Sequence, residues 1–524
     1  MPTPEQGALH PAEPDAGSHD RLPPDPDRTA VWLVAPIALV TAIVLVARGD
    51  RYDYFGDELY FLAAGRHLAP GYADQGPLIP LLARSAAAIA PDSLVLLRLP
   101  SILAAVAAVL LAAAVAREFG GRRGAQVLAA AAYATCPYLV TQAASLSTFA
   151  LDSTLSAATV WLVVRWLRTR RDRLLLAAAV TVAVGLQGKL LIAMLLVSLA
   201  PAVLSAGRGR LLRSRPAWAA AAIVAVSAAP NLWWQHRHGW PQLAMGPVIR
   251  AEEQAANGGV AGLPAHWALL TGLLGGVLAL AGAWALLWHR DFRPYRMIGV
   301  AVAVHVLLVV GLGGRPHYVA AWFPIVFAAG AVVALRSRAA RATATAALAV
   351  STAIAVAVVA LLPLPLSQIR QPTDSRAELS TRMRVFGTSG WSGLVAGVEG
   401  AYRALPPQER AQTVIITRTY WQAAALDQLI EPGRVPVHSP NRGFAYFGGP
   451  PDTARTALYV TTDDAGPRLR AAFESAWPVR RIDERLGFPG IDRGVTVWRC
   501  DRPRRPWPAL WADLTTLTLD HPGT

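Results

Sequence analysis

The sequence predicts an α-helical polytopic membrane protein of about eleven spans that carries a soluble α/β domain at its C-terminal end. Three observations support this class. Of the 524 residues, 54% are apolar and only 16% are charged, a balance that a soluble enzyme of this size rarely shows. Apolar windows of about 20 residues, the length that crosses a bilayer core as a helix, recur through two thirds of the chain. Clusters of arginine separate these windows in a regular order.

The first 30 residues are expected to form a disordered cytoplasmic leader. They are rich in proline and acidic residues and lack both a basic segment and hydrophobic periodicity, so they differ from a signal peptide. A transmembrane module is predicted over residues 31–365. Its apolar windows are 31–47, 95–116, 125–143, 148–167, 174–188, 190–206, 217–234, 266–288, 297–313, 318–335 and 342–364.

Basic side chains follow every second window. Loops rich in arginine and lysine tend to stay in the cytoplasm, so these loops and the leader are predicted to be cytoplasmic. The other loops, including the long loop 48–94, and the tail 366–524 are then expected outside the plasma membrane. Loop charge also explains the formal net charge of +15 without a nucleic-acid partner.

The tail is predicted to form a small α/β domain. Short β-like runs alternate with stretches of helical pattern. The strands are expected at Val414–Thr417, Ala457–Thr462 and Val495–Cys500, and the helices at Gly393–Leu405 and Pro467–Ala476.

Acidic side chains mark the first outer loop. Asp57 and Glu58 are adjacent, and because adjacent residues of a helix do not share a face, one can point into a cleft while the other binds a nearby donor. Alternatively, they begin a solvated helix, where acids are favoured by the helix dipole. Asp74 and Gln75 follow in an irregular segment, 71–80, of a kind that is tolerated near a membrane where it lines a wet cavity or is buried in protein.

Cationic side chains are few outside the basic loops. Lys189, the only lysine, lies in a turn between two apolar windows, where its ammonium group suits the phosphate of a lipid carrier; alternatively, it reaches toward lipid headgroups. Arg98 and Arg315 have the same reach. Asp152 lies just inside the fourth window, a costly place for an acid unless it is paired or faces a cavity.

Aromatic and polar residues end the seventh window. Trp234, Gln235 and His238 could form one wall of a sugar or acceptor site, or the tryptophans there could be interfacial anchors. Neighbouring histidines alone do not make a metal site, because no third ligand stands at a suitable spacing. We expect neither a metal nor a cofactor, and no nucleotide-binding or serine-elbow motif is present.

Taken in order, these segments resemble the protein O-mannosyltransferase superfamily, glycosyltransferase family 39, whose bacterial members include the lipid A aminoarabinose transferases. The motifs that carry the likeness are Phe55–Glu58, Asp74–Leu78, Arg98–Pro100, Asp152, Gly185–Lys189 and Arg315–Tyr318. The tail resembles the outer domain of actinobacterial members. It does so through Phe386–Trp391, Thr419–Ala425 and Trp507–Trp511.

The resemblance implies a GT-C fold whose active site faces outward and uses a polyprenyl-phosphate-linked sugar. It implies a catalytic role for Asp57, with Glu58 completing the acidic pair, and Asp152 is a further catalytic candidate. Contacts to the lipid phosphate and substrate are expected from Lys189, Arg98, Arg315, Tyr318 and the adjacent His317. Gly76 departs from the family, whose members often have two prolines before the leucine, so this stretch is expected to be looser.

The predicted function is transfer of a sugar to an acceptor hydroxyl outside the cytoplasm. Mannose is the commonest implication of the family, and an arabinose-type sugar or a hexosamine is also compatible. Asp57 would act as general base, and Lys189 with Arg98 would clamp the phosphate; a single displacement predicts inversion. The acceptor could be a protein, an envelope glycan or a secreted metabolite.

The alternatives to an enzyme are a transporter or flippase of a lipid-linked substrate and a non-catalytic scaffold. Because the charged groups gather on one side instead of at the midplane, an enzyme is favoured over a transporter.

Overall fold

The computed structural model describes residues 30–51, 53–211, 213–361, 390–431, 433–484 and 487–519. The predicted leader, apart from Ala30, lies outside the described residues. The boundary expected between residues 365 and 366 and the motif residues Phe386–Ser389 also lie outside them.

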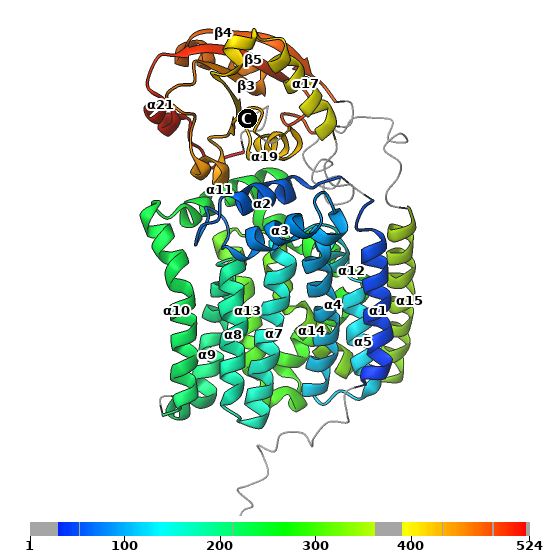
Figure 1. The fold of residues 1–524 in the computed structure, drawn as a ribbon. Helices are drawn as coiled ribbons and strands as arrows, with labels where there is room; N and C mark the ends of the chain where they lie inside the picture. The colour runs from blue at the N-terminus through cyan, green and yellow to red at the C-terminus, as the bar shows by residue number, and fades with distance from the viewer. Residues whose placement is uncertain are drawn as a thin grey trace, which may run out of the picture.

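A bundle of long helices forms the body of the molecule, and the C-terminal domain sits on one end of it (Figure 1). The bundle helices are α1 (Val31–Ala47), α4 (Leu94–Glu118), α5 (Arg123–Ala134), α6 (Pro137–Gln142), α7 (Thr148–Thr169), α8 (Arg173–Gly188), α9 (Ile192–Leu211), α10 (Arg215–Arg237), α12 (Leu263–Trp288), α13 (Arg296–Leu312), α14 (Phe323–Ala334) and α15 (Arg338–Leu361). Each predicted window coincides with one of these helices, with three exceptions: 125–143 is divided between α5 and α6, the first residues of 318–335 form the 3₁₀ helix η3 (Pro316–Trp322) before α14, and 362–364 lies outside the described residues.

The helices have the length and composition of membrane spans. Among the described residues, six are long and apolar enough to cross a bilayer alone, and shorter apolar helices accompany them. Where α12 crosses α14, glycines allow the backbones to approach: a Cβ on Gly282 would lie 1.9 Å from the carbonyl oxygen of Val326, and one on Gly330 would lie 2.1 Å from that of Leu278. Small residues at such crossings are typical of helix packing in membranes. The chain is therefore a multispan membrane protein.

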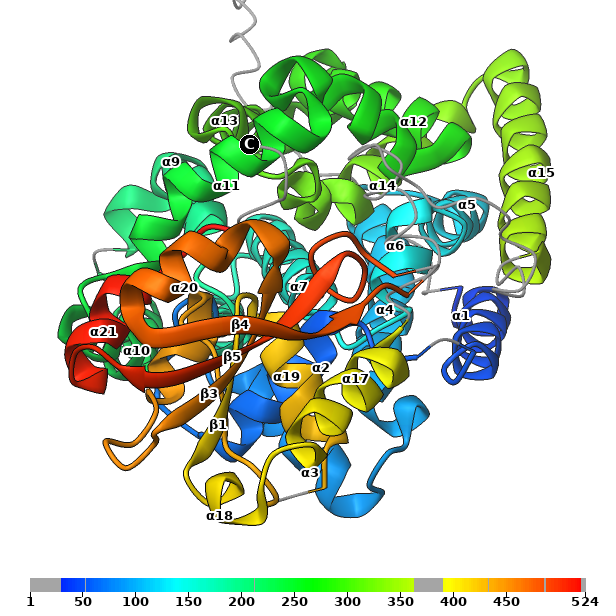
Figure 2. The ribbon, with the colours of Figure 1, turned by 90° about the horizontal axis from the view of Figure 1, so that it is seen from above.

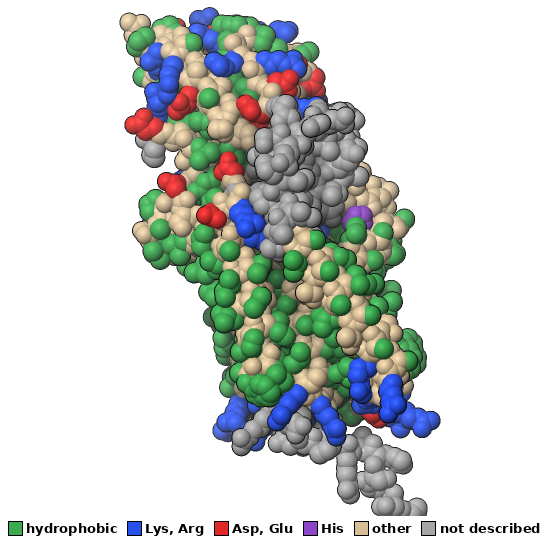
Figure 3. Space-filling model, turned by 90° about the vertical axis from the view of Figure 1, so that its right-hand side faces the viewer, with side chains coloured by type: hydrophobic (Ala, Val, Ile, Leu, Met, Phe, Trp, Pro, Cys, Tyr) green, Lys and Arg blue, Asp and Glu red, His purple; other side chains and the backbone are tan. Residues whose placement is uncertain are grey.

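Arginine side chains are concentrated at one end of the bundle. Figure 3 shows arginine side chains gathered at the end opposite the C-terminal domain, below a broad apolar surface. The loops that follow α4, α7, α12 and α14 all carry the predicted arginine clusters. Seen from above, the C-terminal domain covers only part of the bundle, and α1, α5 and α15 stand beyond its edge (Figure 2).

Short helices close the end of the bundle beneath the C-terminal domain. They are α2 (Gly56–Arg66), α3 (Leu78–Ile89), α11 (Pro241–Asn257), η1 (Gly259–Gly262) and η3 (Pro316–Trp322), while η2 (Arg290–Tyr295) joins α12 to α13. In Figure 1, α2 and α3 lie across the bundle end instead of continuing its helices. The first outer loop thus forms a platform between the two parts of the protein.

The C-terminal domain is built on a five-stranded sheet of order β2-β1-β3-β5-β4. Strand β1 is parallel to β2 and β3, whereas β5 is antiparallel to β3 and β4. The strands are β1 (Thr413–Thr417), β2 (Val437–His438), β3 (Thr456–Thr462), β4 (Phe473–Ile482) and β5 (Val495–Pro503). The helices are α17 (Trp391–Arg403), α18 (Pro407–Arg410), α19 (Tyr420–Leu429), α20 (Gly466–Ala472) and α21 (Trp507–Leu514), with 3₁₀ turns η5 (Arg442–Phe447) and η6 (Asp463–Ala465).

The predicted α/β tail is confirmed in its three strands and its first helix. The helix predicted over 467–476 is wrong in its second half, where the chain enters β4 at Phe473. Pairing with β5 decides this segment, because tertiary contacts override a local helical pattern.

The two parts of the protein share a hydrophobic core. Alternate residues of a strand point to opposite faces: Val414 and Ile416 pack in one cluster with α21, while Ile415 packs in another with α19. That second cluster also contains Leu59 and Ala63 of α2. The C-terminal domain is therefore packed onto the platform through buried apolar side chains.

Candidate active site

A cavity of about 220 Å³ lies between the platform and the C-terminal domain. Its charged and polar lining comes from segments far apart in the sequence: the start of α2, the loop before α3, the start of α7, the α8–α9 turn, the start of α11, η3 with the residue before it, α19 and η5. These residues are Asp57, Asp74, Thr148, Lys189, Gln242, Arg315, Tyr318, Tyr420 and Arg442. Ligand sites often combine such convergent polar groups with apolar walls.

Asp57 stands in the first turn of α2 and is half-buried at the edge of this cavity. Its Oδ1 accepts a hydrogen bond from the Tyr420 hydroxyl at 2.7 Å and one from Trp421 Nε1 at 2.8 Å. Burial, and then the nearby Asp57 carboxylate, raises the pKa of Tyr420 well above its usual value, so the phenol remains a donor at neutral pH. Two fixed donors orient the carboxylate and leave Oδ2 without a hydrogen bond among the described residues.

Glu58 and Arg98 are paired with each other away from the cavity. Arg98 Nε and Nη2 donate to the two carboxylate oxygens of Glu58 at 2.9 and 2.8 Å, and both side chains are buried. Arg98 also donates to the carbonyl oxygens of Gly49 and Asp53, while Glu58 accepts from the backbone N–H of Leu146. This ion pair connects α2 to α4. The structure therefore does not support the expected role of Glu58 in an acidic pair or that of Arg98 in a phosphate clamp.

Asp74 enters the cavity from the irregular loop before α3. Its Oδ1 accepts a hydrogen bond from the Tyr60 hydroxyl at 3.0 Å. Burial raises the pKa of Asp74, although the positive charge of Lys189 opposes this effect. The expected looseness at Gly76 is wrong: its N–H donates to Gly188 at 3.0 Å, and a Cβ there would lie 2.2 Å from the carbonyl oxygen of Gln187.

Lys189 caps α8 and lines the cavity beside Asp74. Its Nζ lies 4.4 Å from the centre of the Phe149 ring, a cation–π distance. Among the described residues no carboxylate lies within ion-pair distance of Nζ. Burial lowers the pKa of Lys189, and the charges of Asp74 and Asp57 act in the opposite direction. An ammonium group held among acids without a direct partner is available for an anionic ligand.

Two arginines add positive charge on the other side of the cavity. Arg315 lies 3.3 Å from Glu252 and 3.7 Å from Glu253, both on α11. Arg442 of η5 forms an ion pair with Glu252 and stacks over the Tyr420 ring at 5.6 Å. These acids hold the two guanidinium groups in place, and both arginines still line the cavity.

Some predicted residues support the cavity instead of lining it. Gln235 Nε2 donates to the carbonyl oxygen of Tyr72 at 2.8 Å and so fixes the loop before α3. Trp234 stacks on His238 at 4.0 Å, and both rings contact Tyr446 of the C-terminal domain. The expected sugar-binding wall formed by Trp234, Gln235 and His238 is therefore not found at this cavity.

The remaining predicted residues lie around its base. Tyr318 lines the cavity, and His317 packs edge-on against Phe149 with ring centres 4.2 Å apart. Asp152 is buried one helical turn beyond Phe149, outside the lining, and its Oδ1 has no hydrogen-bond partner. Gln75 is also buried, and neither atom of its side-chain amide forms a hydrogen bond.

The contribution of the C-terminal domain was missed by sequence reasoning. Tyr420, Trp421 and Arg442 complete the site. In the sequence, only the segment Thr419–Ala425 was noted, as a resemblance to the outer domain of family members to which no role was assigned. A possible signal was the pair of aromatic hydrogen-bond donors at the start of a helix. Within the described part of the chain, no group of three His, Cys, Asp or Glu side chains is arranged to hold a metal ion.

Comparison with solved structures identifies the fold. ArnT from Cupriavidus metallidurans bound to undecaprenyl phosphate is similar at a TM-score of 0.58 with 15% identity, over 90% of this chain and 98% of that one. The apo form of that protein gives 0.56 with 13% identity, over 89% and 98%. The mycobacterial arabinofuranosyltransferase AftD gives 0.50 with 16% identity, over 90% of this chain and 42% of that one. The protein therefore has the GT-C fold.

The sequence comparison finds similarity to one protein family. Residues 74–234 match the family model described as dolichyl-phosphate-mannose-protein mannosyltransferase. The resemblance to the protein O-mannosyltransferase superfamily is thus confirmed, and the matched segment contains Asp74, Asp152 and Lys189. No similar sequence is found among curated proteins.

Proposed function

We propose that the protein is a membrane glycosyltransferase that transfers a sugar, mannose in the first instance, from a polyprenyl-phosphate donor to an acceptor hydroxyl outside the cytoplasm. The observation that carries the proposal is a single cavity that combines the oriented carboxylate of Asp57 with the cations Lys189, Arg315 and Arg442. The fold and the family match over residues 74–234 support the same class of reaction.

In the proposed step, Asp57 acts as the general base. Its Oδ2 removes the proton from the acceptor hydroxyl while the acceptor oxygen bonds to the anomeric carbon of the sugar. The bond between that carbon and the phosphate oxygen breaks, and the phosphate leaves on its lipid with the electron pair. A single displacement inverts the anomeric carbon. A positioned base typically contributes about 10²–10⁴ to the rate.

The cations stabilise the departing phosphate. Lys189 has no ion-pair partner among the described residues, and Arg315 and Arg442 are pre-positioned by acids of α11. Fixed positive groups in a site shielded from water stabilise developing charge without reorganisation. The proposal includes no metal, and we expect chelator treatment to leave the rate unchanged. Asp74 and Asp152 are assigned to holding the charge of Lys189 in place.

The proposed sidedness follows from the loops. Arginine clusters lie at the bundle end opposite the cavity (Figure 3), and basic loops tend to stay in the cytoplasm. The cavity and the C-terminal domain are then outside the plasma membrane. A cysteine introduced at exposed Asp452 should be labelled by an impermeant thiol reagent in intact cells, whereas one introduced at exposed Arg171 should react only after permeabilisation.

The decisive experiment uses purified protein in detergent, polyprenyl-phosphate mannose and an extract of envelope acceptors. Mannosylated product without any sealed vesicle is expected, and Asp57→Asn should reduce the rate at least a hundredfold while the protein elutes normally from a sizing column. Substrate movement across a sealed membrane without product in detergent would mean a carrier. Near-normal turnover by the Asn variant would remove Asp57 as base.

The sugar and the stereochemistry need separate measurements. Parallel reactions with polyprenyl-phosphate arabinose and hexosamine donors compare the sugars directly, and mannose is expected to give the highest kcat/KM. The anomeric configuration of donor and product, read by NMR, should be opposite. Retention would exclude the single displacement and leave the class of enzyme intact.

A further inference from the structure

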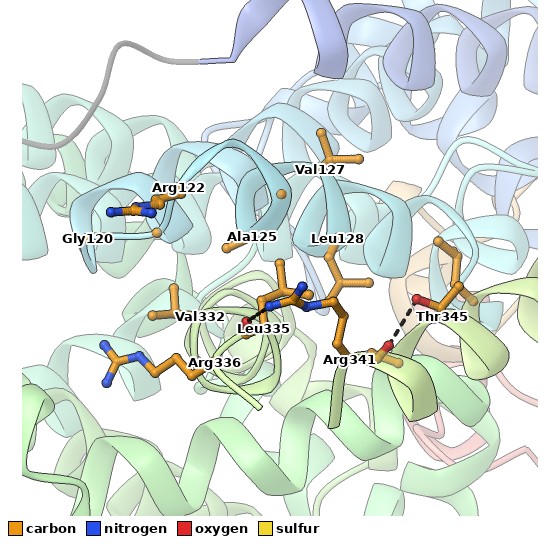
Figure 4. Close-up of a pocket in the computed structure, with 14 residues that line it drawn as sticks. Gly120, Arg122, Ala125, Val127, Leu128, Val332, Leu335, Arg336, Arg341 and Thr345 are labelled. Atoms are coloured by element: carbon orange, nitrogen blue, oxygen red, sulfur yellow. Dashed lines mark hydrogen bonds between the residues drawn. The ribbon is translucent and has the colours of Figure 1, made fainter. Parts of the chain in front are cut away.

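Another cavity, larger than the candidate active site, lies at the basic end of the bundle. It measures about 750 Å³ and is lined by the turn after α4, by α5, by the end of α14 and by the first turns of α15 (Figure 4). It is separated from the active-site cavity by the length of the bundle (Figure 1), and the two share no lining residue. No step of the proposed transfer reaction involves this cavity.

The cavity has an apolar wall. Leu128 of α5, Val332 and Leu335 of α14, and Leu348 of α15 contribute side chains to it. A volume of this size, lined mainly by aliphatic groups, is within the range of ligand-binding pockets in proteins. An acyl chain is a ligand that such a surface accommodates.

Three arginines add charge to the same cavity. Arg122 comes from the turn before α5, Arg336 from the residues after α14 and Arg341 from the first turn of α15 (Figure 4). Arg336 forms an ion pair with Asp291, and Arg341 donates to the carbonyl oxygen of Leu335 at 3.0 Å. Neither Arg122 nor Arg341 has a carboxylate within ion-pair distance among the described residues. The cavity therefore carries an excess of positive charge.

The position of α15 indicates a lipid and not a soluble anion. This helix stands at the edge of the bundle, outside the area covered by the C-terminal domain (Figure 2). Its residues Val350, Ile354 and Val356 are 46–61% exposed, which places an apolar outer surface beside the cavity. A ligand that enters here passes through the hydrocarbon part of a bilayer with its headgroup at the basic end.

We propose that this cavity binds one anionic phospholipid of the adjacent leaflet, with its phosphate between Arg122 and Arg341 and an acyl chain against Leu128 and Leu348. The guanidinium groups match the phosphate in charge and in hydrogen-bond geometry. The lipid fills the space between α15 and the rest of the bundle and so holds that peripheral helix in place. This proposal does not depend on the function proposed above.

The test measures lipid binding to the full-length protein by native mass spectrometry and by thermal shift in detergent. The probes are phosphatidylglycerol, phosphatidylcholine, undecaprenyl phosphate and soluble glycerol phosphate. Phosphatidylglycerol is expected to be retained and to raise Tm by several degrees more than phosphatidylcholine. The double variant Arg122→Gln/Arg341→Gln should weaken its binding by roughly tenfold or more, and Thr345→Trp, which fills the apolar part, should prevent retention of either phospholipid.

Arg171→Gln is the matched control, because Arg171 is exposed at the same end of the bundle but lies outside the cavity. It should bind phosphatidylglycerol as the unchanged protein does. Equal binding of the two phospholipids would overturn the proposal, as would an equal loss in the control variant. Stabilisation by glycerol phosphate alone, or by undecaprenyl phosphate and not by phosphatidylglycerol, would also overturn it.

Discussion

The Tyr420 hydroxyl donates a 2.7 Å hydrogen bond to Oδ1 of Asp57, across 363 residues of sequence. Tyr420 belongs to the C-terminal domain and Asp57 to the first helix of the platform. The same domain provides Trp421 Nε1 at 2.8 Å. The proposed base, Asp57, is thus oriented by the C-terminal domain, which follows the last membrane helix in the sequence. Catalysis and domain docking are expected to depend on each other.

Tyr420→Phe tests this orientation. Removing one hydrogen bond to a charged group costs about 1.5–3 kcal/mol, so kcat should fall roughly tenfold to a hundredfold, while KM for the lipid donor changes little. Steady-state kinetics with both substrates measure this. Tyr402→Phe, in the same domain and away from the cavity, is the control and should keep the full rate. An increase in donor KM without a loss in kcat would assign Tyr420 to substrate binding instead.

Arg98→Ala tests the buried ion pair. The change leaves Glu58 buried and unpaired, and breaking such a pair typically costs about 3–5 kcal/mol. We expect a large loss in Tm, measured by thermal unfolding in detergent. The double variant Glu58→Gln/Arg98→Met removes both charges and should recover part of that loss. A stable Arg98→Ala protein with a raised donor KM would return Arg98 to the phosphate site.

The pH dependence of donor binding tests Lys189. A lysine carries its charge only below its pKa, and burial lowers the pKa of Lys189. As the pH is raised, Lys189 should lose its charge and the donor KM should increase. This increase is expected at a pH below about 10.4, the pKa of an exposed lysine. In Lys189→Arg, whose guanidinium stays charged, the rise should disappear. A rise that persists unchanged in the Arg variant would trace it to another group.

Gly76→Ala tests the close contact between the Asp74 loop and the end of α8. A Cβ at this position would lie 2.2 Å from the backbone oxygen of Gln187, so the loop must shift, at a cost of about 1–3 kcal/mol as in other overpacked sites. Both Tm and kcat should fall. Gly246→Ala, on an exposed face of α11 with open space around it, should leave both unchanged. A fully active and stable Gly76→Ala protein would show that the loop tolerates movement.

The sequence by itself determined the helices of the bundle and the charge difference between its ends. Window length and hydropathy follow directly from bilayer thickness, which is why the predicted windows coincide with helices of the bundle, apart from the breaks inside 125–143 and 318–335. The sequence also separated Asp57 from Glu58, since adjacent helical residues face different directions. It indicated that Asp74, Lys189 and Arg315 could meet, because their loops were expected on one side.

Only the tertiary structure decided which charged groups share the cavity. Arg98 and Lys189 have similar positions at the ends of apolar windows, yet Arg98 meets Glu58 across a helix contact and Lys189 does not. The use of Tyr420 and Arg442 depends on how the C-terminal domain packs on α2. Such contacts arise from the shapes of packed surfaces distant in sequence, and a local pattern of residues contains no information on which surfaces will meet.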